Sequence, residues 1–421
     1  MQLHNIINHI REQFRHHRFF TFLHLFGTTI TVMIATMIIM DLDNRVHPGG
    51  PEENTAQLRY ITRMDVEDNS GISQGSLNLQ VVKKVVDRLS SAKHISFSHS
   101  KSWTLAKGYT PYSLEVRYTN SEFWRVFNFQ FIEGNGYTKT ETENSQKRAV
   151  ISERLRDILF PGKKSVVGKT AEINGKLCTI TGVVENVSAT CQQSYAEAWL
   201  PYTLSNSGTK TDNLTDYGEY VIAILKQKNT SDKILQHQLD KVLVQINQEI
   251  GDSQILLSPV QDSWDVYFLG YRAIKSYEGT LQNLLSLFSR IILVMLIPAI
   301  NLISLNITRM QERSEEIAIR KTYGASNNRL IAQLLTEQGA LTLLAGIIGF
   351  SLAIATFAVY KHKILLSAFE STDSQLFLNI TFLPFAGCLL IIFLLNLMGG
   401  LIPAFKIANL QPARALKGDL S

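Results

Sequence analysis

Four apolar windows divide this 421-residue chain and constrain its fold more than any other feature. A membrane-spanning helix needs about 20 apolar residues, so each window is long enough to cross a bilayer. Only Arg290 is charged within them. The windows cover residues 19–40, 284–307, 339–360 and 382–405. We therefore predict a membrane protein with four transmembrane α-helices.

The charges that flank the first window predict the orientation. Three arginines precede it, whereas Asp41 and Asp43 follow it, so the positive-inside rule places the N-terminus in the cytoplasm. Four crossings then return the C-terminus to the cytoplasm. The resulting topology places 41–283 and 361–381 outside the membrane, and 1–18, 308–338 and 406–421 inside it. The inner segments that follow are basic, although the rule was applied only at the N-terminus.

The N-terminal segment has two readings. Residues 3–14 place five apolar side chains on one helical face, which predicts an amphipathic helix lying along the inner leaflet. The following window could instead be a cleaved signal peptide. However, its apolar run is too long for that, and Met37–Asp41 contains no pair of small residues for a cleavage site. We interpret 19–40 as an uncleaved anchor.

The long segment 41–283 has ordinary globular composition and is predicted to be an extracytoplasmic α+β domain, inserted between the first and second spans. It opens with a linker around Pro48–Pro51. Helical periodicity occurs at 79–89 and 234–250, and a short helix is expected at 153–160. Alternating or apolar runs that predict strands lie at 95–97, 103–105, 112–118, 127–131 and 149–151.

Asn174-Gly175 is the strongest local signal in this domain. It separates two alternating runs, and Asn-Gly is the preferred two-residue turn of a β-hairpin. Just before it, residues 161–170 superficially resemble a phosphate-binding loop. That motif requires glycine where Lys163 stands and a helix after it, so we predict a turn leading into the hairpin.

The remaining chemistry-bearing residues are sparse. Cys178 and Cys191 could pair outside the cytoplasm, but Cys178 alternates with Ile180 and therefore also fits a core strand position. The ten histidines are scattered without metal-ligand spacing. No nucleophile–base combination is apparent either, so a membrane-anchored enzyme has little support. The chain has a net charge of +5, and its basic residues cluster beside the apolar windows. This clustering favours membrane lipid over nucleic acid as the partner.

A dense charged stretch, 309–326, lies between the second and third windows and must sit in water at one membrane face. Glu316 and Arg320 are four apart in the favourable order for a solvated helix. Gly324 can end that helix. Apolar residues on such a helix suggest a docking face, and the alternative is a merely solvated connector. The predicted docking residues are Arg313, Glu316, Ile317, Ile319, Arg320, Lys321 and Gly324.

Small residues recur every four positions in the third window, at Ala345, Gly349 and Ala353. In membrane helices such a stripe allows another helix to approach closely. We predict that this face is a helix-packing surface.

Several motifs together resemble a known family. In the cytoplasmic segments these are Arg313-x-x-Glu316-Ile-Ala-Ile-Arg320-Lys321-x-x-Gly324, Leu334-Leu-x-Glu337 and Pro412-Ala-x-Ala-Leu416. In the extracytoplasmic segment they are Glu122-Phe-Trp124, Glu133-Gly134, Val150-Ile-Ser-Glu153, Val167-Gly-Lys169 and Gly182-Val-Val184. Their order and the four-span layout resemble the MacB/FtsX family of ABC-transporter permeases. The resemblance covers nearly the whole chain, which lacks the fused nucleotide-binding domain of MacB itself.

This resemblance implies a bacterial inner-membrane permease that acts as a dimer. ATP and magnesium are then expected in a separate cytoplasmic ATPase subunit, and no cofactor is expected in this chain. ATP-driven closure would move the outer domains by mechanotransmission, to export a drug, peptide or lipoprotein. An FtsX-like regulator that activates an extracytoplasmic partner, such as a cell-wall hydrolase, is the alternative. The sequence leaves open whether the dimer is homomeric, and whether a periplasmic adaptor and an outer-membrane channel join it.

Overall fold

The computed structural model describes residues 18–107, 110–206, 213–251, 253–263, 265–266 and 326–360, with eight isolated residues between 285 and 394. The chain divides into two compact units. One, which we call the membrane unit, comprises Met1–Asp43, Ser286–Tyr360 and Ile380–Ser421. The other, the outer domain, comprises Asn44–Leu285 and Lys361–Asn379. We describe each unit by itself.

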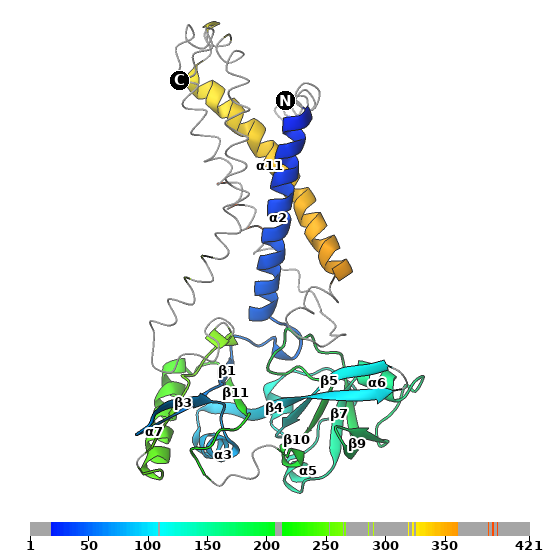
Figure 1. Cartoon of the computed structure of the whole chain (residues 1–421), viewed down its shortest axis with the longest axis vertical. Helices are drawn as coiled ribbons and strands as arrows, with labels where there is room; N and C mark the ends of the chain where they lie inside the picture. Colours follow the sequence, from blue (N-terminus) through cyan, green and yellow to red (C-terminus); the bar gives the residue numbers. More distant parts are fainter. Residues whose placement is uncertain are drawn as a thin grey trace. The chain divides into compact units, whose positions relative to one another are not determined.

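Two long apolar helices are described in the membrane unit, α2 (Arg18–Val46) and α11 (Asn327–Tyr360) (Figure 1). Each contains a stretch long and apolar enough to cross a membrane, Thr21–Met40 in α2 and Gly339–Thr356 in α11. These stretches coincide with the first and third predicted windows. The second and fourth windows, the N-terminal amphipathic helix and the C-terminal tail lie outside the described residues.

The outer domain is built on a mixed sheet that contains nine of the described strands. Its main path runs β1-β11-β4-β5-β10-β7-β9-β6, and β8 pairs with β9. The strands are β1 (Leu58–Ile61), β4 (Ala92–Lys107), β5 (Thr110–Thr119), β6 (Phe131–Gly134), β7 (Arg148–Ser152), β8 (Thr170–Ile173), β9 (Lys176–Val184), β10 (Ala198–Pro201) and β11 (Val221–Lys226). Only the β10–β5 and β7–β9 pairs are parallel, which fits the predicted α+β class.

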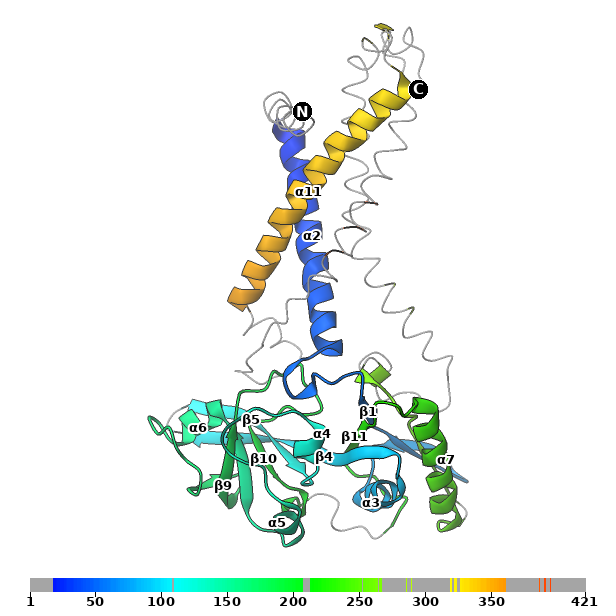
Figure 2. The same cartoon turned by 180° about the vertical axis from the view of Figure 1, so that it is seen from behind.

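One end of the domain is a lobe of helices and a small second sheet. That sheet joins β12 (Gln254–Leu257), β2 (Met64–Asp68) and β3 (Gly71–Gly75) in this order. Helices α3 (Leu79–Arg88) and α7 (Asp232–Gln248) confirm the two helical periodicities. Their apolar faces form a buried cluster with β4, β11 and β12, which includes Val85, Phe97, Leu239 and Ile255. Both views place this lobe at one end and α6 at the other (Figures 1 and 2).

The other lobe contains the short helices α4 (Phe123–Val126), α5 (Lys139–Glu143) and α6 (Glu153–Leu159), with the 3₁₀ turns η1 (Gly50–Glu52) and η2 (Tyr202–Leu204). The predicted hairpin is confirmed. Strands β8 and β9 pair with Ile173 opposite Lys176, and Asn174 and Gly175 have φ of 47° and 73°. Positive φ at both turn residues is the signature of the type I′ turn that Asn-Gly favours.

One expectation for this lobe is corrected, and one open question is settled. The alternating phenylalanines at 127–131 do not form one strand, because Phe127 ends α4 and only Phe131 begins β6. Their rings instead fill a cluster around the buried Trp199. Cys178 and Cys191 are both free and buried, and they belong to different clusters. Cys178 occupies the core strand position that its alternation with Ile180 predicted.

Candidate functional site

The predicted docking residues lie almost wholly outside the described part of the chain. Of the seven, the structure describes Ile319 alone, whose side chain is about half exposed. Its carbonyl accepts hydrogen bonds from Thr322 Oγ1 at 2.6 Å and from the Tyr323 amide at 3.3 Å. Tyr323 is also exposed, so two large apolar side chains face solvent one turn apart. Arg313, Glu316, Ile317, Arg320, Lys321 and Gly324 lie outside the described residues.

The small-residue stripe of α11 faces α2 within the membrane unit. Ala345 and Ala353 are fully buried. A Cβ added at Gly349 would lie 2.7 Å from the Thr29 carbonyl oxygen, so the backbones approach too closely there for any larger residue. Thr29 Oγ1 donates a hydrogen bond to the Ala345 carbonyl at 3.4 Å. The stripe therefore marks a close crossing of α2 and α11, as small residues do in membrane helices.

The linker that follows α2 is fastened into the outer domain by one buried carboxylate. Glu52, only 3% exposed, ends the turn η1. Its Oε1 accepts hydrogen bonds from the Gln193 amide at 3.0 Å and from the amide and hydroxyl of Ser194, both at 2.8 Å. Burial raises the pKa of Glu52, and these hydrogen bonds oppose the rise. The linker is thereby tied to residues 188–195, which we call the 188–195 loop.

The same loop is held from its other side by Arg117 of β5. The guanidinium donates to two loop carbonyls, from Nε to Tyr195 at 3.0 Å and from Nη2 to Gln192 at 2.9 Å. It also donates to Ser98 Oγ at 3.2 Å and Glu115 Oε1 at 3.3 Å. Arg117 is buried, so these partners are what make its charge tolerable there. The loop thus gives its amides to Glu52 and its carbonyls to Arg117.

A second buried carboxylate, Glu197, fixes the strand that leaves the loop. Its Oε1 accepts from Tyr195 Oη at 2.7 Å and lies 3.3 Å from Arg154 Nη1. Its Oε2 accepts from the Glu115 amide at 2.7 Å. Burial raises the pKa of Glu197, against the effect of these partners. Glu52, Arg117 and Glu197 therefore all hold the C-terminal end of the loop, residues 192–195.

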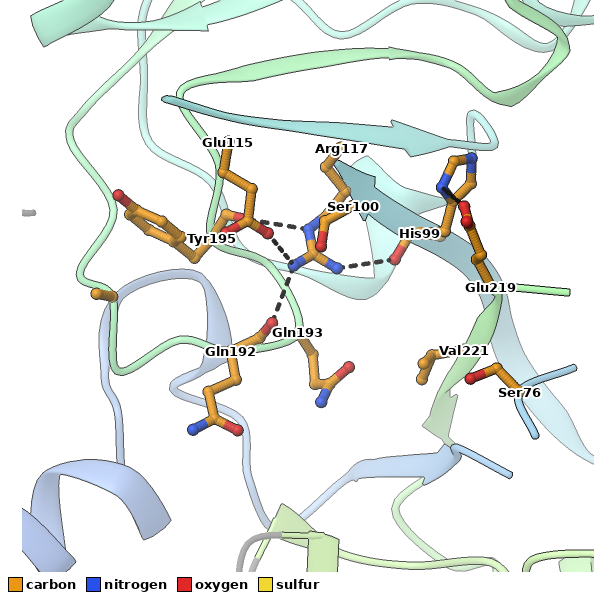
Figure 3. Close-up of a pocket in the computed structure, with 12 residues that line it drawn as sticks. Ser76, His99, Ser100, Glu115, Arg117, Gln192, Gln193, Tyr195, Glu219 and Val221 are labelled. Carbon is orange, nitrogen blue, oxygen red and sulfur yellow. Dashed lines mark hydrogen bonds and ion pairs between the residues drawn. The ribbon is translucent and has the colours of Figure 1, made fainter. Parts of the chain in front are cut away.

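Beyond the loop lies a cavity of about 400 Å³ in the outer domain (Figure 3). One wall consists of the loop and Arg117, and another consists of Ser76, Glu219 and Val221. Figure 3 shows the Arg117 hydrogen bonds to Glu115 and to the loop. The full lining is Ser76, Ser98, His99, Ser100, Glu115, Arg117, Ala189, Gln192, Gln193, Tyr195, Glu219 and Val221. Most of these residues carry polar or charged side chains, although their carbon atoms supply about as much of the cavity surface as their polar atoms do.

His99 sits at one corner of this cavity. Its Nε2 lies 2.8 Å from Ser205 Oγ, and its Nδ1 lies 3.3 Å from Glu219 Oε2 without hydrogen-bond geometry. Its ring stacks on Tyr118. Burial lowers the pKa of His99 to about 4, although Glu219 opposes the shift, so the ring is neutral at pH 7. The 3.3 Å between His99 Nδ1 and Glu219 Oε2 would suit an ion pair. Because the Glu219 side chain is half exposed, it raises the pKa of His99 by less than burial lowers it.

The order Ser205–His99–Glu219 resembles a hydrolytic triad, but the arrangement does not support hydrolysis. Ser205 is only 5% exposed and does not line the cavity. A substrate carbonyl in the cavity therefore cannot reach Ser205 Oγ, as nucleophilic catalysis requires. Among the described residues no group of three or more metal-ligating side chains converges either. The geometry is that of a polar cavity beside a loop that Glu52 ties to the α2 linker.

The sequence patterns identified none of the residues that line this cavity, and they did not identify Glu52 or Glu197 as buried carboxylates. Glu52 lies in the segment expected to be a linker, and the polar residues of β4 and β5 alternate with buried ones as on a solvent-facing strand. Arg117 alternates with Val116 and Tyr118 just as Glu115 alternates with its neighbours, so the strand pattern did not set it apart.

Comparison with known families matches nearly all of the chain. Residues 19–241 match the model of the MacB-like periplasmic core domain, and residues 288–412 match that of the FtsX-like permease C-terminal domain. The first match includes α2 and most of the outer domain. The second covers the predicted docking stretch.

Individual relatives are distant. The chain is 24% identical over 329 residues to the macrolide export ATP-binding/permease protein MacB 2 of Yersinia pestis, covering 76% of this chain but 44% of that protein. It is 22% identical to the uncharacterised ABC transporter permease YknZ of Bacillus subtilis, covering 86% and 85%. It is 23% identical to the pyoverdine export protein PvdT of Pseudomonas syringae, covering 96% and 57%. The chain thus spans about half the length of the MacB relatives that it matches.

Solved structures of outer domains are also similar to part of this chain. The periplasmic region of MacB from Actinobacillus actinomycetemcomitans is 13% identical, with a TM-score of 0.34, covering 50% of this chain and 94% of that one. A domain of a permease from Porphyromonas gingivalis is 15% identical, with a TM-score of 0.37, covering 49% and 90%. The assignment rests on the family models, the first of which matches more than half of the chain. The chain belongs to the family of membrane permeases that combine a MacB-like periplasmic core domain with an FtsX-like C-terminal domain.

Proposed function

We propose that this chain is the permease subunit of an ABC transporter whose ATPase is a separate cytoplasmic protein. The ATPase binds ATP and magnesium, and the permease transmits its movement to the outer domain. Family membership supports this proposal. The docking residues around Ile319 form the contact with the ATPase.

The fastening of the α2 linker is the observation that carries the mechanical part of the proposal. Helix α2 continues as helix for six residues beyond its apolar stretch, to Val46. The linker then enters the core at Glu52, where one buried carboxylate oxygen receives three hydrogen bonds. Buried charged hydrogen bonds are costly to break, so displacement of α2 pulls on the 188–195 loop before the linker detaches.

Removal of the docking stretch tests the proposal. The full chain is co-purified with its ATPase in nanodiscs, and ATP hydrolysis is measured with and without residues 313–324. We expect the deletion to abolish permease-dependent stimulation of hydrolysis. The point variant Ile319→Asp should reduce stimulation at least tenfold, whereas Ile234→Asp, at a half-exposed isoleucine of α7, should not. Full stimulation after the deletion would overturn the proposal.

The transported cargo is proposed at the level of a drug, peptide or lipoprotein, and the working unit is a dimer of permeases in the bacterial inner membrane, with both termini in the cytoplasm. A periplasmic adaptor and an outer-membrane channel are further candidate partners. The alternative is an FtsX-like regulator that activates an extracytoplasmic protein, such as a cell-wall hydrolase, without transport. Movement of a labelled cargo in reconstituted vesicles separates the two functions.

A further inference from the structure

The cavity bounded by the 188–195 loop has the volume of a small-molecule site. Its volume of about 400 Å³ lies at the lower end of the range of roughly 300–1,000 Å³ that small-molecule sites occupy. Its walls come from β4, β5 and the loop on one side, and from the chain around Ser76 and Glu219 on the other. A ligand there would contact two parts of the outer domain at once.

The charge distribution decides what sign of ligand the cavity accepts. Arg117 supplies the one cationic side chain in the lining, but Glu115 and the loop carbonyls already engage its guanidinium. Glu219 is the most available charge, because its side chain is 52% exposed. Lys101 approaches Glu219 no closer than 3.7 Å, at an exposed position where ion pairs contribute little. The cavity therefore favours an ammonium group over an anion.

The neutral groups decide the rest of the ligand. Ser76, Ser100, Gln192 and Gln193 add hydroxyl and amide groups that can donate and accept hydrogen bonds. His99 adds a buried Nδ1 that has no hydrogen bond and lies beside Glu219 at the cavity wall. Apolar surface comes from Ala189, Val221, the Tyr195 ring and the carbon atoms of the polar side chains, and suits the carbon faces of a small polar molecule. A large apolar compound would leave most of these polar groups unpaired, which is costly.

We infer that this cavity is a binding site for a small, hydroxyl-rich molecule that carries a primary amine, such as an amino sugar of one or two rings. The amine binds the Glu219 carboxylate, and the hydroxyls bind the serine and glutamine side chains. Binding does not depend on the permease function proposed above, and it persists in the absence of any ATPase. The ligand rests against the same 188–195 loop that Glu52 fastens to the α2 linker.

Calorimetric titration of the full chain in nanodiscs tests the site with chitobiose, the disaccharide of glucosamine. Its N,N′-diacetyl form is the matched neutral probe of the same ring skeleton. We expect chitobiose to bind one site per chain and the diacetyl form to bind at least tenfold more weakly. Absence of chitobiose binding, or equal affinity for the two sugars, would overturn the inference.

Two variants locate the binding to this cavity. Glu219→Gln should weaken chitobiose at least tenfold while leaving the diacetyl form unchanged, and Ser100→Trp should block both sugars. Ser100 is exposed on β4 and Glu219 is half exposed, so neither substitution burdens the core. Glu172→Gln, at an exposed position of β8, is the control and should bind as the parent does. Unchanged binding in Glu219→Gln would overturn the inference even if Ser100→Trp failed to fold.

Discussion

Removal of the Glu52 carboxylate should destabilise the outer domain far more than its place in a linker suggests. In Glu52→Ala, the amides of Gln193 and Ser194 lose their acceptor inside the protein, and the Ser194 hydroxyl loses its partner. A buried donor left without an acceptor costs about 1–3 kcal/mol, and the two amides cannot turn elsewhere. With the small cavity added, we expect a loss of about 3–5 kcal/mol.

Tryptophan fluorescence gives a direct assay in the full chain. All four tryptophans, Trp103, Trp124, Trp199 and Trp264, lie in the outer domain, so the membrane spans contribute no signal. Trp199 Nε1 donates to the Ser194 carbonyl at 3.0 Å and therefore reports on the loop that Glu52 holds. Urea unfolding of the chain in detergent then compares the variants through their free energies of unfolding.

Two further substitutions separate the anchor from its surroundings. Glu53→Ala removes the neighbouring exposed carboxylate, which accepts one hydrogen bond from Asn128, and should cost less than 1 kcal/mol. Glu52→Gln keeps an acceptor oxygen and removes the buried charge, so we expect a change within about 1 kcal/mol. A cost below 1 kcal/mol for Glu52→Ala, or equal costs for Glu52→Ala and Glu53→Ala, would refute the anchoring argument.

Two other predictions follow from the described helices and from His99. Gly349→Val should destabilise the crossing of α2 and α11 by about 1–3 kcal/mol in thermal unfolding of the detergent-solubilised chain, because its Cβ meets the Thr29 carbonyl; Ile347→Val on the exposed side is the control, and equal melting temperatures would contradict the packing. His99 should make the outer domain less stable in acid. Its pKa is lowered from 6.5 to about 4, so its stabilisation is complete above pH 6.5 and is lost as pH falls towards 4, by about 2–3 kcal/mol. The same urea assay should show a flatter acid limb for His99→Gln, and an unchanged limb would contradict the burial of a neutral ring.

Local chemistry made some elements predictable. Asn174-Gly175 specified the β8–β9 hairpin because two residues with positive φ suffice to reverse the chain. Helix α7 was predictable because Leu235, Leu239, Val242 and Ile246 recur on one face, and all four are buried. The phenylalanines at 127–131 misled because alternation is a strand signal only when the backbone is extended. In this segment Phe127 directly follows the last residue of α4 and is buried at the end of that helix, before β6 begins at Phe131.

The fastening of the linker and the cavity could not be predicted because their residues are distant in sequence. Glu52 and Ser194 are separated by 142 positions, and Ser98 and Arg117 by 19. On β4 and β5 the polar side chains alternate with buried apolar ones, a pattern that predicts a face in water. That face is instead covered by the 188–195 loop, which has neither helical nor strand periodicity. Only the tertiary fold reveals that Arg117 is buried.

The 188–195 loop links two buried side chains of opposite charge, Glu52 and Arg117. Its amides point to the Glu52 carboxylate and its carbonyls point to the Arg117 guanidinium, so the loop lies between opposite charges. Arg117 also lowers the pKa of Glu52, which means that each group reduces the cost of burying the other. A linker that withdrew Glu52 without the loop would leave the Gln193 and Ser194 amides without their acceptor, whereas Arg117 would keep its partners in the loop and on β4 and β5. Withdrawing the linker alone therefore costs the hydrogen bonds of one buried carboxylate, and withdrawing the loop with it would cost the Arg117 hydrogen bonds to the loop as well.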